Sequence, residues 1–234
     1  MKKIKLFIRK KNSTNHHSIE RFAQTLLNRL KVDNAEIAII NCPLPSNGFF
    51  KRIYLIFWAF FKQGDVNHIL GDINFISILM SKEKTINTFL DCRLLNEFKG
   101  LKKKIYQYFW FKFPIKKSII STFISDFTKN EITQRLSLKN NFKSEIIPVP
   151  IVSSVYQKKN LSNKNNILII GTEKHKNIYN MIKGSLGLNV KFNIVGKLEN
   201  NIRDFLNKEN IIYENFVDIS DEEIINLYKK NSIL

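Results

Sequence analysis

Short apolar runs along the chain alternate with stretches whose apolar residues recur every three or four positions, a pattern that predicts buried strands alternating with amphipathic helices. Strands are expected at 5–9, 36–40, 66–70, 85–90, 117–122, 145–149, 167–170, 190–195 and 211–216. Helices are expected at 18–30, 49–62, 98–113, 125–136, 177–186, 202–206 and 221–229. This alternation predicts an α/β protein with parallel sheets that are covered by helices on both faces.

Two residues help to define where the expected helices begin and end. Pro114 is expected to end the helix over 98–113, because proline lacks the N–H that a helix interior needs. Ser125 is expected to cap the helix that follows it, because a serine hydroxyl accepts hydrogen bonds from the free N–H groups of a first turn.

A polar stretch divides the pattern into two runs. Residues 153–166 are rich in Ser, Asn and Lys and show no apolar periodicity, which indicates a linker. Residues 1–152 are then one complete Rossmann-like domain. Residues 167–234 offer three strands, whereas a doubly wound domain has about five or six. We therefore expect the second domain to be the first half of a fold that continues beyond Leu234.

Composition and charge narrow the class of protein. The chain is 44% apolar and 25% charged, which excludes global disorder. Its 38 basic and 20 acidic residues give a net charge of +18, which favours anionic partners such as lipid surfaces, nucleotide phosphates or nucleic acid. Specific nucleic-acid binding is not expected, because the basic residues are spread along the chain and no RNA- or DNA-binding motif appears.

The cellular setting is expected to be the cytoplasm. Cys42 and Cys92 are too few and too far apart for a disulfide framework or a metal cluster, and we expect reduced thiols. The start of the chain lacks the apolar region of a signal peptide, so no export is expected. The longest apolar run, at 53–61, is much shorter than the roughly 20 residues of a membrane-spanning helix.

Two aromatic segments leave two interpretations open. Residues 48–63, GFFKRIYLIFWAFFKQ, and 102–117, KKKIYQYFWFKFPIKK, combine many Phe, Tyr and Trp residues with lysines near their ends. Such mixtures are typical of elements that lie in a membrane interface. Alternatively, the aromatic residues are buried and the lysines solvate the helix ends. The first interpretation predicts a protein that is peripheral on the inner face of the plasma membrane.

Several segments, in their order along the chain, resemble the retaining GT-B glycosyltransferases of the group-one, family-four type. They are DVNHILGD at 65–72, KSIISTFISDFTKNEI at 117–132, IIPVPI at 146–151, ILIIGTEKHKNIYNMIKG at 167–184, KFNIVGKL at 191–198 and DISDEEIINLYKKNSIL at 218–234. The resemblance implies transfer of a sugar from a nucleotide-diphosphate sugar to a glycan or lipid-linked acceptor, in the assembly of surface polysaccharide or lipopolysaccharide. No metal and no other cofactor is expected, because no acidic metal-binding triplet appears and the lysines supply positive charge. The alternative is a basic protein that binds nucleic acid or a membrane surface without catalysis.

The donor side of the resemblance falls at two strand ends of the second run. Gly171 and Thr172 follow one strand, Lys176 and Asn177 begin the next helix, and Gly196-Lys197 follow the second strand. Ligands of open parallel sheets bind outside the carboxyl ends of the strands, where a lysine can contact a diphosphate. The alternative is that both glycine-containing segments are plain turns with solvated lysines.

On the acceptor side, the resemblance implies a catalytic role for Asp91, which follows Leu90 where the family has a His-Asp pair. Asp72, at the end of the strand 66–70, is expected on the acceptor side, as are His16 and His17 in the loop after the first strand. The alternatives are a turn aspartate and two unremarkable loop histidines. The family's two donor-contacting glutamates are expected beyond Leu234, so that this chain by itself is expected to be an inactive fragment.

Overall fold

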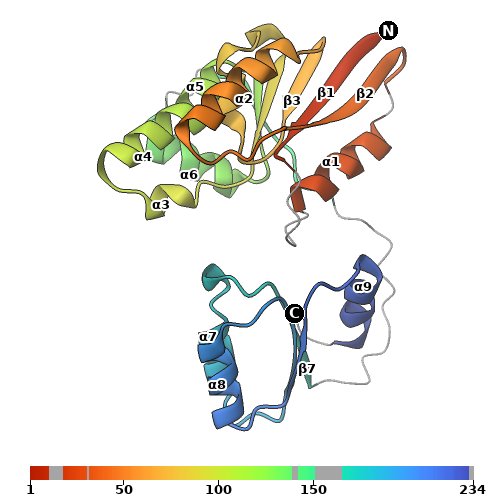
Figure 1. The fold of residues 1–234 in the computed structure, drawn as a ribbon, viewed down its shortest axis with the longest axis vertical. Coiled ribbons are helices and arrows are strands. Elements are labelled where there is room, and N and C mark those ends of the chain that lie inside the picture. Colours follow the sequence, from red (N-terminus) through yellow and green to blue (C-terminus); the bar gives the residue numbers. More distant parts are fainter. Residues whose placement is uncertain (11–17, 31, 139–141, 151–164, 232–234) are drawn as a thin grey trace. The chain divides into compact units, whose positions relative to one another are not determined.

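The computed structural model describes residues 1–10, 18–30, 32–138, 142–150 and 165–231 (Figure 1). The chain divides into two compact units, Met1–Ile151 (unit 1) and Val152–Leu234 (unit 2). Most of the stretch expected as a linker, 153–166, lies outside the described residues. Asn166 is placed differently from the expectation, because it is the first residue of a strand of unit 2.

Unit 1 is built on a six-stranded parallel sheet of order β2-β1-β3-β4-β5-β6. Its strands are β1 (Lys2–Ile8), β2 (Ala35–Asn41), β3 (Val66–Ile69), β4 (Thr85–Phe89), β5 (Ile120–Phe123) and β6 (Ser144–Ile146). Because β2 and β3 lie on opposite sides of β1, the strand order reverses there. In sheets of this kind such a reversal leaves a crevice at the carboxyl ends of the strands.

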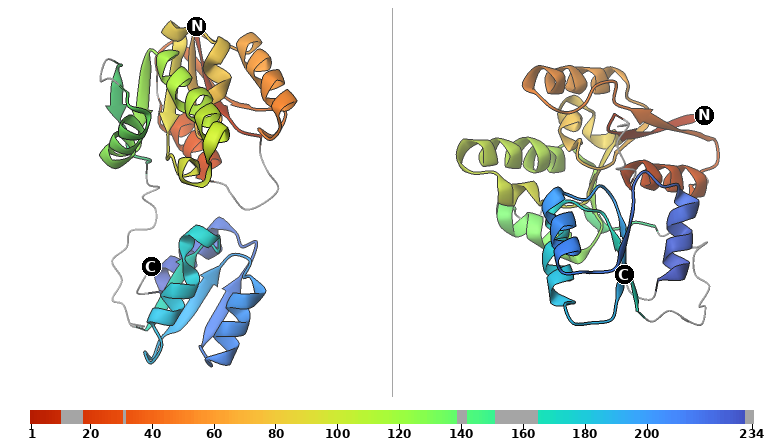
Figure 2. Two further views of the ribbon diagram at one scale, coloured as in Figure 1. Left: turned by 90° about the vertical axis from the view of Figure 1, so that its left-hand side faces the viewer. Right: turned by 60° about the horizontal axis from the view of Figure 1, so that its bottom comes forward.

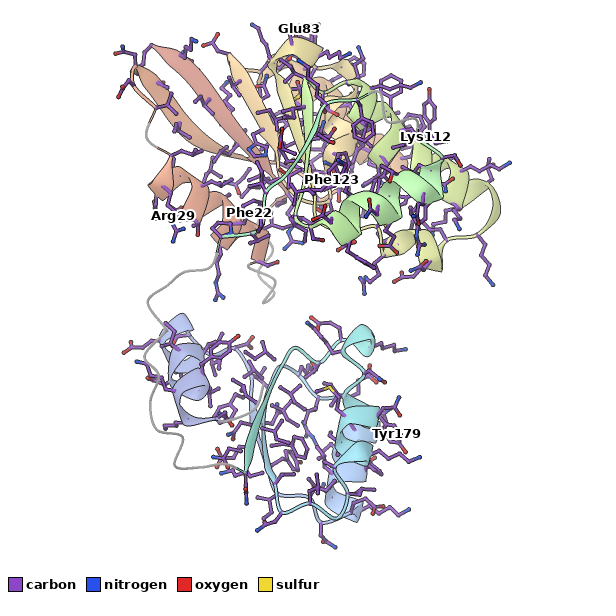
Figure 3. All side chains as sticks on the ribbon, turned by 180° about the vertical axis from the view of Figure 1, so that it is seen from behind. Phe22, Arg29, Glu83, Lys112, Phe123 and Tyr179 are labelled. Atoms are coloured by element: carbon purple, nitrogen blue, oxygen red, sulfur yellow. The ribbon has the colours of Figure 1, made fainter. Side chains whose placement is uncertain are left out.

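Helices cover both faces of this sheet (Figures 1 and 2). Helix α1 (Ser18–Arg29) packs on β1 and β2, where Leu6, Phe22 and Leu70 belong to one buried cluster. The opposite face carries α2 (Phe49–Phe61), the 3-10 segment Asn74–Leu79, the short α3 (Leu94–Glu97) with the helical stretch that follows it, and α6 (Asp126–Leu136). Its larger core contains Phe123, which Figure 3 shows in the interior.

The helical stretch at 98–113 departs from the expectation. It consists of α4 (Gly100–Gln107), a π-helical turn (Tyr108–Lys112) and α5 (Phe113–Lys116). The prediction that this helix ends before Pro114 is wrong. Pro114 lies in the first turn of α5, where its missing N–H costs little.

Unit 2 contains a three-stranded parallel sheet of order β7-β8-β9. Its strands are β7 (Asn166–Ile170), β8 (Lys191–Val195) and β9 (Tyr213–Phe216). Helices α7 (Ile178–Gly184) and α8 (Asn200–Lys208) lie on one face and α9 (Asp221–Lys230) on the other (Figure 1). Apolar residues of α7, α8 and the sheet, among them Ile182, Phe192 and Leu206, form one core. The α/β fold class with parallel sheets is thus confirmed.

Candidate functional site

In unit 2, the two strand ends that the sequence indicates lie side by side. The Gly171 N–H donates to the Val195 carbonyl at 2.9 Å, and the Thr172 hydroxyl donates to the Lys197 carbonyl at 2.8 Å. These bonds hold the loop after β7 against the loop after β8. The structure therefore brings Gly171, Thr172, Gly196 and Lys197 to one edge of the sheet.

Both glycines of this edge are required by their surroundings. Gly196 has φ of 129°, and a Cβ there would lie 2.8 Å from Thr172 Oγ1 and 2.9 Å from its methyl carbon. Gly171 has φ of 88°, and its Cβ would lie 2.8 Å from Glu173 Oε2 and 3.2 Å from Lys176 Cε. Glycine adopts these backbone conformations at low cost, and here it also lets the two loops approach each other closely.

Lys176 and Asn177 immediately precede α7, although the helix is shorter than the expected 177–186. Lys176 ends a 3-10 turn, and Asn177 is the N-cap residue in the left-handed conformation, with φ of 55°. The side chain of Lys176 lies beside Gly171. The Asn177 side-chain oxygen accepts a hydrogen bond from the Asn180 amide at 2.7 Å. An anion at this edge would therefore meet the charge of Lys176 more than the dipole of a long helix.

A cavity of about 230 Å³ opens between the beginnings of α7 and α8. Thr172 and Asn177 line it, together with residues that the sequence analysis did not single out, namely Glu173, Lys174, Tyr179, Glu199 and Asn201. Lys176 and Lys197 are not among the described residues that form its wall. Figure 3 shows Tyr179 on α7, and its ring lies 4.7 Å from that of Phe205, centroid to centroid. All of the missed residues except Tyr179 share one signal, since they lie within six positions of a strand's carboxyl end.

In unit 1, charged residues gather where β1, β3 and β4 end. Arg9 follows β1, and its Nε lies 3.2 Å from Glu20 Oε1 of α1. Asp72 follows β3 and Asp91 follows β4, and both residues are exposed. The structure therefore places Asp72 at the reversal point of the strand order, beside an Arg9–Glu20 pair that the sequence does not indicate, and Asp91 at the end of the next strand along the sheet.

The surroundings of Asp72 at this edge shift the pKa of its carboxyl group. Its pKa is raised because surrounding protein atoms displace water from the carboxyl group. The positive Arg9 opposes this shift, whereas the negative Glu20 and Asp91 add to it. A carboxylate with a raised pKa is a stronger base than an ordinary aspartate.

Asp91 has a local structural role as well as an accessible carboxylate. Its Oδ1 accepts a hydrogen bond from the Arg93 N–H at 3.0 Å, the geometry of a turn aspartate. The same edge holds aromatic residues from the helical stretch after β4. Trp110 donates from its indole nitrogen to the Asp72 carbonyl at 2.8 Å. Burial, with further contributions from Asp91 and Asp72, raises the pKa of Tyr106.

His16 and His17 lie outside the described residues. A different histidine, His68, lies on β3. Its Nε2 lies 2.7 Å from the Thr88 hydroxyl, which lies 2.7 Å from the Thr122 hydroxyl. Burial lowers the pKa of His68 to about 4, so that its ring is neutral at physiological pH.

The described residues contain neither a cluster of metal ligands nor a membrane-spanning helix. Among them, no group of three or more His, Cys, Asp or Glu side chains is arranged to hold a metal ion. In the same part of the chain, no helix combines the length and the apolar character needed to cross a bilayer.

Comparison with known proteins finds solved structures of similar fold but no protein of matching sequence. Neither a scan of protein-family models nor a search of curated proteins gives a match. Among solved structures, the crystal structure of Alr3699/HepE from Anabaena in complex with UDP and glucose is similar with a TM-score of 0.70 and 8% identity, over 99% of this chain and 72% of that chain. MurG of Acinetobacter baumannii is similar with a TM-score of 0.50 and 10% identity, over 98% and 70% of the two chains. The chain thus has the fold of the GT-B glycosyltransferases.

Proposed function

We propose that the chain is a glycosyltransferase that moves a sugar from a nucleotide-diphosphate sugar to a hydroxyl of a glycan or lipid-linked acceptor. The observation that carries the proposal is the fold shared over 99% of the chain with HepE, whose structure holds UDP and glucose. The polar strand ends of both units support it, since parallel sheets bind ligands at that edge. The finer assignment is a retaining, family-four type enzyme of surface polysaccharide or lipopolysaccharide assembly, which the sequence resemblance supports.

On this proposal, unit 2 binds the donor. Gly171 and Gly196 let the diphosphate approach the backbone, and Thr172 and Asn177 offer polar contacts beside it. Lys176 and Lys197 supply positive charge as the bond between the anomeric carbon and the diphosphate breaks and the nucleoside diphosphate leaves. Since the lysines neutralise the leaving group, the proposal requires no metal and no other cofactor.

Unit 1 then serves the acceptor. The acceptor oxygen forms the new bond to the anomeric carbon, and its proton must pass to a base. Asp72 supports this assignment through its raised pKa and its position after the carboxyl end of β3. Asp91 lies at the same edge and is the catalytic candidate that the resemblance indicates. His16 and His17 remain acceptor-side predictions.

The proposed setting is the cytoplasm, with the protein peripheral on the inner face of the plasma membrane. Nucleotide sugars are water-soluble, whereas a lipid-linked acceptor is confined to the bilayer. An enzyme that joins the two works where both are present.

The donor assignment is tested by titrating the full chain with UDP, UDP-glucose, GDP and GDP-mannose in a calorimeter. Replacing Lys176→Ala removes a charge-assisted contact and should weaken binding of the preferred nucleotide about tenfold. Lys183→Ala is the matched control, because Lys183 is an exposed lysine in the last turn of α7, the helix that follows Lys176. Equal weakening by both substitutions, or no binding of any nucleotide, would contradict the proposal.

A further inference from the structure

The water-exposed side of α2 is almost entirely apolar. Leu55 and Ala59 hold the helix on the core, and both are fully buried. The opposite side presents Phe50, Ile53, Tyr54, Phe57 and Phe61. Phe50 is 83% exposed and Phe61 is 77% exposed. A helix that is apolar on both sides is expected to be covered on both sides, and an exposed apolar patch of this kind marks an interaction surface.

A second apolar stripe lies on the neighbouring helical stretch. Leu101, Ile105 and Tyr108 of α4 and the π-helical turn are exposed and spaced by four and three residues, so that they share one side of the helix. The two stretches are linked in space, because the Arg52 guanidinium of α2 lies 4.8 Å from the centre of the Trp110 ring. Both lie on the same side of the sheet, opposite α1 (Figure 2).

The charges around these stripes are all of one sign. Residues 48–63 carry three basic residues and residues 98–117 carry seven, and neither segment contains an Asp or a Glu. Lys51, Lys102 and Lys104 are exposed. We call the two apolar stripes with these three lysines the aromatic-basic surface.

The charge decides between the candidate occupants of this surface. A second copy of the chain, related by a two-fold axis, would place the same lysines against one another and cost electrostatic energy. An anionic bilayer complements them, since its headgroups attract the lysines while its acyl boundary accepts the aromatic rings.

We propose that the aromatic-basic surface of α2 and α4 docks the protein onto a membrane that contains anionic phospholipid. Helix α2 then lies in the interface plane, with Phe50, Phe57 and Phe61 among the headgroups and upper acyl chains. The inference identifies the surface through which the protein contacts the membrane, which the proposed function leaves open. It does not rest on the proposed transferase activity, because docking needs neither nucleotide nor acceptor.

The test is co-sedimentation of the full chain with vesicles, in the absence of any nucleotide. Vesicles of phosphatidylcholine alone are compared with vesicles that contain about 30% phosphatidylglycerol. The wild-type chain should bind the anionic vesicles, and raising the salt from about 0.1 M to about 0.5 M should weaken this binding.

Matched variants distinguish vesicle binding through the aromatic-basic surface from nonspecific binding through other exposed residues. Phe61→Ser should weaken binding to the anionic vesicles about tenfold. The control is Phe127→Ser on α6, since Phe127 is a phenylalanine of similar exposure, 74%, outside the surface. Lys102→Ala with Lys104→Ala should weaken binding roughly ten- to thirtyfold. Its control is Lys229→Ala with Lys230→Ala in the last turn of α9, which removes the same charge from exposed positions elsewhere.

Three outcomes would overturn the proposal. The first is a wild-type chain that does not bind anionic vesicles. The second is equal weakening by each variant and its control, which would assign the binding to the diffuse charge of +18. The third is a dimer in solution that Phe61→Ser dissociates without any effect on vesicle binding, which would assign the surface to a second copy. The lysine pair keeps the test decisive if Phe61→Ser fails to fold.

Discussion

At the scale of single residues, burial changes the acid–base behaviour of several groups in unit 1. Desolvation raises the pKa of Cys42 and of Cys92 to about 12 and lowers that of His68 to about 4. Both cysteines are buried free thiols. Because the thiolate is the reactive form of cysteine, these two residues are structural and take no part in the proposed chemistry.

The partly buried His68 ties the stability of unit 1 to pH. The unfolded chain takes up a proton near the usual pKa of 6.5, whereas the folded chain does so near 4. Between these values the unfolded state binds more protons, so stability falls as the pH drops below 6.5. From pH 7.5 to pH 5 we expect His68 alone to remove about 2 kcal/mol from the free energy of unfolding.

Urea titrations at the two pH values measure this loss. Tryptophan fluorescence reports unit 1 specifically, since the chain has two Trp residues and both, Trp58 and Trp110, lie in that unit. A His68→Gln variant keeps an amide for the Thr88 hydroxyl and should lose about 2 kcal/mol less than wild type over this range. Equal losses in both proteins would show that His68 ionises normally in the folded state.

Single residues of the candidate site were predictable only where they adjoin a strand. Gly171, Thr172, Gly196 and Lys197 follow apolar runs directly, so the sequence alone indicated the edge at which they lie. Arg9 also follows a strand, but its significance depends on Glu20, which α1 brings to it. The positions of Trp110 and Tyr106 near Asp72 depend on how a distant helical stretch packs.

At the scale of elements, helix and strand boundaries follow local chemistry closely. Strand β4 begins at the expected Thr85, and α6 begins after Ser125 as expected. The Ser125 hydroxyl accepts a hydrogen bond from the Thr128 N–H at 3.1 Å. The helices at 98–113 were less predictable, because the π-helical turn and the placement of Pro114 depend on packing against Phe75 and Phe89.

The cap of α6 has a measurable contribution to stability. Ser125→Ala leaves the Thr128 N–H without its side-chain acceptor and should lower the free energy of unfolding of unit 1 by about 1 kcal/mol. Ser125→Asp preserves an acceptor and should remain close to wild type. Urea titration followed by tryptophan fluorescence measures both variants. Similar losses for alanine and aspartate would mean that the hydroxyl acts in some way other than as a helix cap.

At the scale of the whole molecule, the two units differ in how many of their described strands are paired on both sides. Unit 1 has a six-stranded sheet with helices on both faces, and β3 and β4 lie in its interior. The described part of unit 2 has three strands, of which β8 alone is paired on both sides. Edge strands open more readily than interior strands, since fewer contacts must be broken.

The rate of backbone amide hydrogen exchange should therefore differ between the two units. We expect the amides of β3 and β4 to be the most protected of the chain, and those of β9 to exchange faster than those of β8. Mass spectrometry after pulses of increasing length measures this order directly. Equal protection of β4 and β9 would indicate that unit 2 gains stability from contacts beyond its own three strands.

The sequence by itself determined the α/β class, the order of the elements and the strand ends at which polar residues gather. These features depend on hydrophobic period, on capping residues and on glycine, all of which act over a few neighbouring positions. Tertiary structure alone decided which residues from distant segments meet, such as Arg9 with Glu20 and Arg52 with Trp110. It also decided that the aromatic side of α2 faces water. The physical reason is that a periodic pattern shows which residues are apolar, whereas only packing shows which of them find a partner.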